Sequence, residues 1–333
     1  MTRREFIRAV LGTAVTGSWP LVANAEQAGS LKRVGLLMLY TEGDPTGSAR
    51  LKSLQQSLGK LGWADGSNVN IEVRWGGADT ERIRRFAREL VAGQPDVIVT
   101  TSTPTTAAAQ RETRSIPIVF TVVSDPIGQG FVEDLARPGG NITGFTNFEP
   151  SMAGKWLALL KEIDPRIVRS AGLFNPDTAP DGGAFFYRPF EAAAQALAIA
   201  PLVTPVRSNA DIDSAITAVA REPSAGLVVM ADSFMAAHRA RIIELAASNR
   251  VPAIYPFYVA PAEGGLLSYG PSVEELFHQV APYVDRILRG AKPSELPVQA
   301  PIKFELAVNL GTAKRLGLDV PATLLARADA VFE

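Results

Sequence analysis

Val-Gly-Leu-Leu-Met-Leu, residues 34–39, is an almost continuous apolar run with the length of a β-strand. Such a run is typical of a parallel strand whose two faces are both covered by helices. Four leucines with helical spacing follow between residues 51 and 61, and Gly62 then supplies a helix stop. This strand and helix are the first of many similar pairs, so the sequence predicts an α/β fold built on parallel sheets.

The alternation of strands and helices occurs in two sets. In the first set, further strands are expected at residues 69–75, 96–100 and 117–121. A stretch rich in proline and glycine, residues 124–150, interrupts the pattern. It then restarts, with strands expected at residues 170–174, 202–206, 227–230 and 252–255. Two sets of βα units separated in this way predict two lobes, each a mostly parallel sheet flanked by helices.

The remaining tail is too short to form a third domain. It contains an expected strand at residues 266–269, a helix beginning after Ser272 and a last strand at residues 303–309. These elements would complete the two sheets already described, so the chain is expected to cross between lobes more than once and to form a multi-strand hinge. The expected N-terminal lobe is residues 31–146 plus about 268–292, and the expected C-terminal lobe is residues 147–267 plus about 293–333.

The first 25 residues have the pattern of a cleaved export signal. Three arginines precede a short, weakly apolar stretch at residues 9–22, and Ala23-Asn24-Ala25 places small residues before an expected cleavage site. The string Thr-Arg-Arg-Glu-Phe-Ile, residues 2–7, resembles the twin-arginine pattern of bacterial signals. The chain has no cysteine for a lipid anchor. We therefore expect an exported, soluble protein that is not lipid-anchored.

The composition and the motifs argue against several classes of protein. With 33 basic and 34 acidic residues among 333, the chain lacks the basic surface of a nucleic-acid binder. The absence of cysteine excludes disulfides and thiolate chemistry, and the two histidines lie 40 residues apart in sequence. No nucleophile elbow, phosphate-binding loop or dinucleotide-binding glycine motif occurs. We therefore expect a binding protein with no catalytic residues, no metal and no cofactor.

Candidate binding residues follow the ends of the predicted strands, because open parallel sheets bind ligands beyond their carboxyl ends. The hydroxyl-rich turn at residues 101–105 opens a helix and suits a carboxylate, although ordinary helix capping uses the same residue types. Aspartates could receive an ammonium group or hydroxyls, and aromatic side chains could stack on a ligand or belong to the core. The candidates are Tyr40, Thr41, Ser102, Thr103, Thr105, Asp125, Asn147, Asn175, Asp177, Asp232, Ser233, Phe257 and Tyr258.

Ten strings in the chain, in order, resemble the ABC transporter substrate-binding protein family, in the branch related to tryptophan and tyrosine binders. They are Arg-Val-Gly-Leu-Leu (33–37), Pro-Asp-Val-Ile (95–98), Ile-Pro-Ile-Val-Phe (116–120), Ser-Asp-Pro (124–126), Arg-Pro-Gly-Gly-Asn-Ile-Thr-Gly (137–144), Lys-Trp-Leu (155–157), Phe-Asn-Pro (174–176), Asp-Ser-Phe (232–234), Gly-Gly-Leu-Leu-Ser-Tyr-Gly (264–270) and Ala-Lys-Arg-Leu-Gly-Leu (313–318).

The resemblance implies a type I periplasmic-binding protein fold, in which two lobes close on a small solute. It further implies a monomer in the periplasm that delivers the solute to an ABC transporter permease in the inner membrane. The solute would be amino-acid-like or an aromatic carboxylate. Its carboxylate would bind the turn at residues 101–105, its ammonium group Asp125 or Asp232, and its side chain the aromatic residues.

Alternative functions remain open at this point. A periplasmic sensor that presents its closed form to a signalling receptor would have a similar sequence. Aromatic residues together with aspartate and asparagine also suit a sugar-type solute. An exported enzyme on a similar α/β scaffold is a third alternative, although no catalytic motif supports it.

Overall fold

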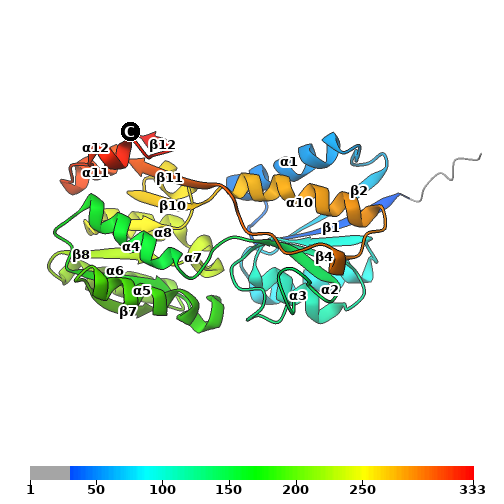
Figure 1. The fold of residues 1–333 in the computed structure, drawn as a ribbon, viewed down its shortest axis with the longest axis horizontal. Helices are drawn as coiled ribbons and strands as arrows, with labels where there is room; N and C mark the ends of the chain where they lie inside the picture. Colours follow the sequence, from blue (N-terminus) through cyan, green and yellow to red (C-terminus); the bar gives the residue numbers. More distant parts are fainter. Residues whose placement is uncertain (1–30) are drawn as a thin grey trace, which may run out of the picture. The chain divides into compact units, whose positions relative to one another are not determined.

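The computed structural model describes residues 31–333, and the expected export signal at residues 1–25 lies outside that part of the chain. Two β-sheets organise the described residues (Figure 1). The five-stranded sheet has the strand order β2-β1-β3-β4-β5, and all of its pairs are parallel. Its strands are β1 (Lys32–Met38), β2 (Val69–Trp75), β3 (Val97–Thr100), β4 (Ile118–Val123) and β5 (Ile142–Thr146).

The second sheet has seven strands in the order β12-β11-β10-β9-β8-β6-β7. Only β10 and β11 pair antiparallel, while every other pair in this sheet is parallel. Its strands are β6 (Arg169–Phe174), β7 (Ala200–Pro205), β8 (Ala225–Val229), β9 (Ala253–Tyr255), β10 (Leu267–Pro271), β11 (Phe304–Asn309) and β12 (Ala330–Phe332). The predicted architecture, two mostly parallel sheets in an α/β fold, is thus confirmed.

Helices pack against both sheets. We use "first lobe" for the five-stranded sheet with α1 (Pro45–Lys60), α2 (Thr80–Ala92), α3 (Thr103–Glu112), α10 (Val273–Leu288) and the short 3-10 helix η2 (Pro293–Glu295). The "second lobe" is the seven-stranded sheet with α4 (Met152–Ile163), η1 (Pro180–Gly183), α5 (Ala184–Ala196), α6 (Asn209–Arg221), α7 (Ser233–Ala237), α8 (Arg239–Ser248), α9 (Val259–Ala262), α11 (Leu310–Leu316) and α12 (Ala322–Leu325). Among the described residues, no helix is long and apolar enough to cross a membrane.

Local sequence signals explain where several helices begin. The Asp44 side chain accepts hydrogen bonds from the backbone N–H groups of Thr46 and Gly47, and Pro45 occupies the first turn of α1. Ser102 caps α3 through the N–H of Thr105. Serine and aspartate are favoured at such positions because their oxygens satisfy N–H groups that have no partner inside the helix.

The chain crosses between the two lobes three times, and two crossings differ from the sequence-based boundaries. Strand β10 pairs in the seven-stranded sheet, so residues 267–271 belong to the second lobe rather than to the first. The last crossing follows Gln299, whose backbone bonds to Gly144 and Thr146 at the edge of the first sheet. Apolar patterns reveal which segments are strands, whereas the sheet edge on which each segment pairs depends on contacts distant in sequence.

The tail helix completes the first lobe. Helix α10 lies alongside α1 against the five-stranded sheet (Figure 1). Leu276, Phe277 and Val284 of α10 are fully buried in the same apolar cluster as the strand residues Val34 and Val99. Residues of α10 thus build the core beneath β1, although the two elements are more than two hundred positions apart, so the first lobe needs a late segment of the chain.

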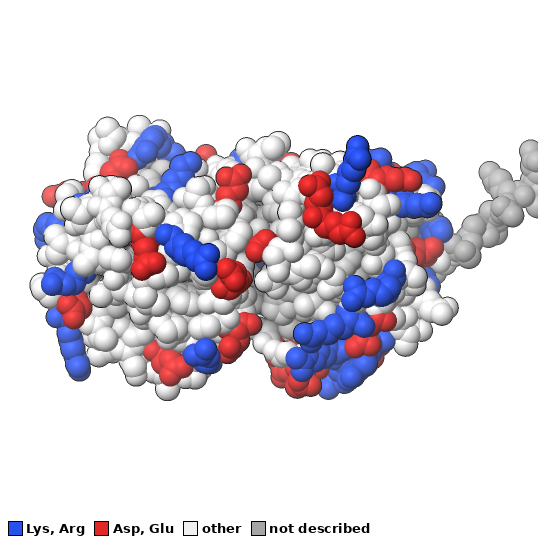
Figure 2. Space-filling view, turned by 60° about the horizontal axis from the view of Figure 1, so that its bottom comes forward, with Lys and Arg blue, Asp and Glu red and all other residues white. Residues whose placement is uncertain are grey.

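Charged side chains of both signs are intermixed on the face of the molecule in Figure 2. Helix α2 illustrates the pattern, because its arginines pair with nearby carboxylates. Arg84 contacts Glu81, and Arg85 contacts Glu89. Exposed pairs of this kind contribute little to stability, each typically below about 1 kcal/mol.

The core of the second lobe is centred on Trp156 of α4. This side chain is fully buried, and its ring lies with centroid distances of 5.3 Å from Phe148 and 5.5 Å from Phe186. Its Nε1–H donates a hydrogen bond of 2.7 Å to the backbone carbonyl of Tyr269 in β10. Trp156 therefore joins a helix, a strand and the crossing segment after β5.

We predict that Trp156→Ala lowers the free energy of unfolding by about 3–5 kcal/mol, because it leaves a large cavity in a packed core. Trp156→Phe keeps an aromatic ring but leaves the Tyr269 carbonyl without its donor, and should cost about 1–3 kcal/mol. Urea unfolding of residues 26–333 measures both. Val203→Ala, at an exposed strand position, is the control and should change little. Equal stability of the wild type and Trp156→Ala would contradict this account of the core.

Candidate functional site

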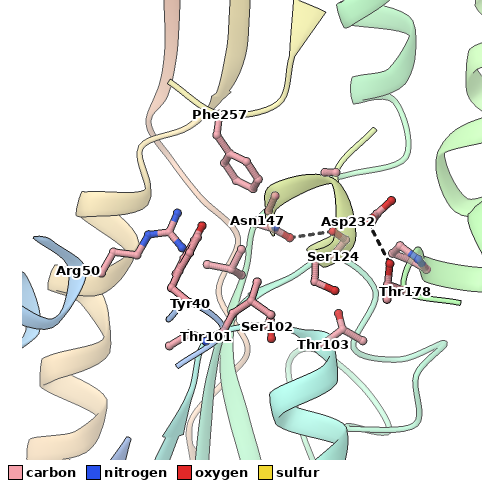
Figure 3. Close-up of a pocket in the computed structure, with 16 residues that line it drawn as sticks. Tyr40, Arg50, Thr101, Ser102, Thr103, Ser124, Asn147, Thr178, Asp232 and Phe257 are labelled. Carbon is pink, nitrogen blue, oxygen red and sulfur yellow. Dashed lines mark hydrogen bonds between the residues drawn. The ribbon is translucent and has the colours of Figure 1, made fainter. Parts of the chain in front are cut away.

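A cavity lies where the carboxyl ends of the strands of both sheets come together (Figure 3). It encloses about 440 Å³ of empty space, solvent at its mouth included. The first lobe contributes Leu39, Tyr40, Arg50, Thr101, Ser102, Thr103, Val122 and Ser124, and the crossing segment after β5 contributes Asn147. The second lobe contributes Thr178, Pro180, Ala231, Asp232, Ser233, Ala236 and Phe257. Most of these residues directly follow a strand, as the general rule for parallel sheets leads one to expect.

Seven of the thirteen candidate residues from the sequence line this cavity: Tyr40, Ser102, Thr103, Asn147, Asp232, Ser233 and Phe257. The structure thus brings together residues that are up to 217 positions apart, Tyr40 and Phe257 (257 − 40 = 217). The other six candidates do not line it.

The six remaining candidates have other surroundings. Thr41 is exposed, and Asn175 is buried behind the cavity wall. Asp177 pairs with Arg207 at the surface. Tyr258 is 38% exposed and packs edge-on against Phe332.

Asp125 and Thr105 complete this group, and both serve local turns. The Asp125 carboxylate accepts a hydrogen bond from the Gly128 N–H. Thr105 is fully buried beneath the hydroxyl-rich turn that precedes α3. The loops expected from the sequence border the cavity, but neighbouring residues of a loop point in different directions.

The hydroxyl-rich turn is held together mainly by its own side chains. The Thr105 hydroxyl accepts a hydrogen bond from the Thr101 N–H and donates one to the Ser102 carbonyl. The Ser102 hydroxyl accepts from the Thr105 N–H, and Pro104 has no N–H to offer. Ser102 and Thr103 are the turn residues that face the cavity together with Thr101. Several of the hydroxyl and N–H groups that suggested an anion site are thus already hydrogen-bonded within the turn.

On the opposite wall, Asp232 acts as a structural carboxylate. Its Oδ1 accepts hydrogen bonds from the Thr178 hydroxyl at 3.0 Å and from the Met235 N–H at 2.8 Å. Its Oδ2 accepts from the Asn175 N–H at 2.9 Å. Burial raises the pKa of Asp232 to about 6, although these hydrogen bonds act in the opposite direction. Asp232 therefore ties the loop after β6 to the start of α7 and positions the wall of the cavity.

Three further polar side chains equip the cavity for hydrogen bonding. The Ser124 hydroxyl donates to Asn147 Oδ1 at 2.9 Å, which fixes the amide and directs its Nδ2 donors elsewhere (Figure 3). The Ser233 hydroxyl oxygen is buried and has no hydrogen-bond partner within residues 31–333. Since a buried polar group without a partner is costly, Ser233 is a position where a ligand or water can bind.

Arg50 lines the cavity although it was not among the sequence candidates. It is 7% exposed, and its guanidinium carbon lies 4.9 Å from the centre of the Tyr40 ring. The signal that could have revealed it is its spacing. Arg50 precedes the fully buried Leu54 and Leu58 at intervals of four, so it occupies the inward face of α1.

A second, more apolar cavity adjoins the first, with about 410 Å³ of empty space when open solvent is included. The two share Tyr40, Arg50, Ala236 and Phe257. The additional lining residues are Val229, Met235, Arg239, Tyr255, Pro256, Val259 and Ala260. Together the cavities offer a polar compartment and an apolar compartment, with Tyr40 and Arg50 between them. Within residues 31–333, no cluster of histidine and carboxylate side chains is suited to hold a metal ion.

Comparisons with known proteins agree on one family. A sequence model described as "ABC transporter substrate binding protein" matches residues 40–332. The tyrosine-binding protein of Clostridioides difficile strain R20291 is 24% identical over 287 residues, which is 86% of this chain and 81% of that protein.

Solved structures agree with this result. A conserved domain protein from Vibrio cholerae is 28% identical and has a TM-score of 0.83, covering 90% of this chain and 99% of its own. The ABC domain from Streptococcus pneumoniae in complex with L-Trp is 24% identical and also has a TM-score of 0.83, covering 91% and 100%. The resemblance inferred from the ten sequence strings is confirmed.

The buried carboxyl of Asp232 predicts a specific pH dependence. The pKa of Asp232 is about 6 in the folded chain and 3.8 in the unfolded chain, so the folded state binds the proton more tightly. The stability that follows from this difference is complete only below about pH 4, where both states are protonated. That contribution disappears as the pH rises through 6. The free-energy advantage of the wild type over Asp232→Asn should therefore shrink by up to about 3 kcal/mol between pH 4 and pH 7. Urea unfolding at both pH values measures it, and a constant difference would contradict the burial argument.

Proposed function

Because the chain belongs to the ABC transporter substrate-binding protein family, we propose that it captures a small carboxylate-bearing solute between its two lobes and delivers it to a membrane permease. Proteins of this family bind small molecules and are not enzymes. The observation that carries the proposal is the cavity at the carboxyl ends of both sheets, to which both lobes contribute hydrogen-bonding and aromatic side chains.

The two compartments suit an amphipathic solute, either amino-acid-like or an aromatic carboxylate. Ser102, Thr103 and Asn147 offer neutral hydrogen-bonding groups in the polar compartment. Phe257 and Tyr40 offer rings at its boundary with the apolar compartment, where an apolar or aromatic body would pack. Two related proteins support this class, since one is a tyrosine-binding protein and another is in complex with L-Trp.

Delivery requires the lobes to respond to the solute. A ligand shifts a conformational equilibrium only as far as it binds one state better than another. A solute that contacts walls from both lobes has this property, because those walls can surround it only when the lobes are closed. A closed, loaded form would then dock on a permease in the inner membrane. The export signal expected at residues 1–25 supports a periplasmic location for this monomeric receptor.

One side chain already contacts both lobes. Arg239 of α8 lies on the second lobe, where Glu263 Oε1 accepts from its Nη2 at 2.9 Å. The same Nη2 donates to the Thr46 hydroxyl of the first lobe at 3.3 Å and lies 3.6 Å from Asp44 Oδ2. Arg239 and Asp44 are 16% and 18% exposed, so water screens this pair only partly. Such a contact favours the closed arrangement.

We predict that the chain binds at least one small carboxylate among L-tyrosine, L-tryptophan and related aromatic acids. At a hundred times its dissociation constant, a ligand stabilises the fold by roughly 2.7 kcal/mol, which raises the melting temperature by several degrees. Thermal unfolding of residues 26–333 against a panel of amino acids, aromatic acids, sugars and nucleosides measures this. A response to sugars or nucleosides with none to acids would contradict the proposed solute class.

A blocking variant tests whether binding occurs in the cavity. Ala236 lines both compartments, so Ala236→Trp should fill them and weaken binding by at least about tenfold. Ala237, the next residue of α7, is exposed, and Ala237→Trp is the matched control. Isothermal titration with the best acid of the panel compares the two. Equal affinity for both variants would place the binding site elsewhere.

The contact between lobes makes a further prediction. Arg239→Met removes the charge that reaches Asp44 and should weaken solute binding by about threefold to tenfold, because the closed state loses stability. Arg241→Met is the control, since Arg241 also lies on α8 but pairs with Asp213 of the same lobe. Titration calorimetry measures both. If the two variants bind equally well, Arg239 does not favour closure.

A further inference from the structure

Arg50 is a buried cation without an anionic partner. Its side chain extends from α1 to the Tyr40 ring at the edge of the cavity (Figure 3). The guanidinium carbon lies 4.9 Å from the centre of the Tyr40 ring and 5.8 Å from that of Phe277. Within residues 31–333, the Arg50 guanidinium takes part in no ion pair and no hydrogen bond, and its nitrogens are not among the fully enclosed side-chain atoms without a partner, so they face the cavity. The residue is nevertheless only 7% exposed.

The fold leaves the guanidinium donors of Arg50 to water or to a solute in the cavity. A guanidinium carries five N–H donors, and moving it out of water is costly unless those donors and the charge are compensated. The two aromatic rings supply part of the compensation through cation–π contacts, but they accept no hydrogen bonds in the plane of the group. A planar anion is the partner that fits, because a carboxylate can accept two parallel hydrogen bonds from one guanidinium.

Arg239 provides the contrast within the same region. Its guanidinium carbon also lies near the Tyr40 ring, at 5.8 Å from the ring centre. Unlike Arg50, it makes hydrogen bonds to the Glu263 carboxylate and lies near Asp44. The fold thus supplies a carboxylate for one arginine beside Tyr40, while the other lines both compartments without one. Carboxylates of the protein bind Arg239, whereas the donors of Arg50 are available to water or to a solute.

We propose that Arg50 binds the carboxylate of the solute and selects acids over their uncharged analogues. This inference rests on the proposed function and assigns the carboxylate to Arg50 instead of the turn at residues 101–105. Arg50 lines both compartments, so an acid bound to it would sit at their junction, with an apolar body beside Phe257. The only acidic residue in the wall of the polar compartment, Asp232, already accepts three hydrogen bonds from the chain. Arg50 is therefore the charged side chain in this wall that remains available to a solute.

A thermodynamic cycle between protein and ligand tests this assignment. The probes are L-tyrosine, L-tryptophan and indole-3-propionate, each compared with its own carboxamide, which has nearly the same shape without the negative charge. The proteins are the wild type, Arg50→Met, Arg50→Lys and Lys52→Met. Lys52 is an exposed residue of the same helix, so Lys52→Met removes one positive charge without touching the cavity. Isothermal titration gives each dissociation constant.

The wild type and Lys52→Met should bind the acid at least about tenfold more tightly than the amide. In Arg50→Met, the dissociation constants of acid and amide should lie within about twofold of each other, because the guanidinium that distinguishes the two ligands is absent. Arg50→Lys should keep part of the preference, since it retains the charge but not the two parallel donors. This lysine variant also keeps the test decisive if Arg50→Met does not fold.

Two results would overturn the assignment. If Arg50→Met weakens the acid and the amide equally, Arg50 only supports Tyr40 and does not recognise charge. If Arg50→Met and Arg50→Lys both keep the full preference for acids, another group binds the carboxylate. Failure of the wild type to bind any of the three acids would instead contradict the proposed solute class, and the assignment of Arg50 with it.

Discussion

Parallel strand pairing is the constraint on which the rest of this structure depends. In a parallel sheet all strands end at the same edge, so the loops that follow them gather there whatever their separation in sequence. Two such sheets, joined by three crossings of the chain, place Tyr40, Ser102 and Asn147 opposite Asp232 and Phe257 around one cavity. The crossings also make each lobe depend on distant segments, as α10 shows by completing the core beneath β1.

The chemistry of the cavity divides its residues by task. Some side chains build the walls, as Asp232 does by binding Asn175, Thr178 and Met235, and as Thr105 does beneath its turn. Others remain available for a solute, including the Ser233 hydroxyl and the Arg50 guanidinium. Residues of the first kind hold the loops of the site together, while those of the second kind are free to contact a solute. The distinction rests on hydrogen bonds, and residue type alone does not reveal it.

The sequence was sufficient to predict two sheets and most of their strands, because continuous apolar runs and helical spacing report burial directly. It missed the edge strands β5, which lies in the stretch 124–150 expected to interrupt the pattern, and β12, because neither contains a long apolar run. It also located the loops of the cavity, since these follow the strands. It did not predict that β10 pairs in the second sheet, because that pairing depends on β9 and β11 rather than on local pattern. Nor did it single out Arg50. This residue matters because it lies on the inward face of α1, lines the cavity and forms no ion pair within residues 31–333. Family resemblance supplied the general function, whereas the identity of the solute depends on these individual side chains.

The central claim is that a solute bound between the lobes favours their closure, and the distance between lobes tests it most directly. The chain contains no cysteine, so Arg88→Cys on α2 and Arg221→Cys on α6 provide two unique, exposed attachment sites for spin labels. Pulsed electron resonance then gives the distribution of distances with and without a saturating acid. The acid should narrow the distribution and shift it to the distance of the closed structure. A distribution unchanged by a ligand that demonstrably binds would contradict it.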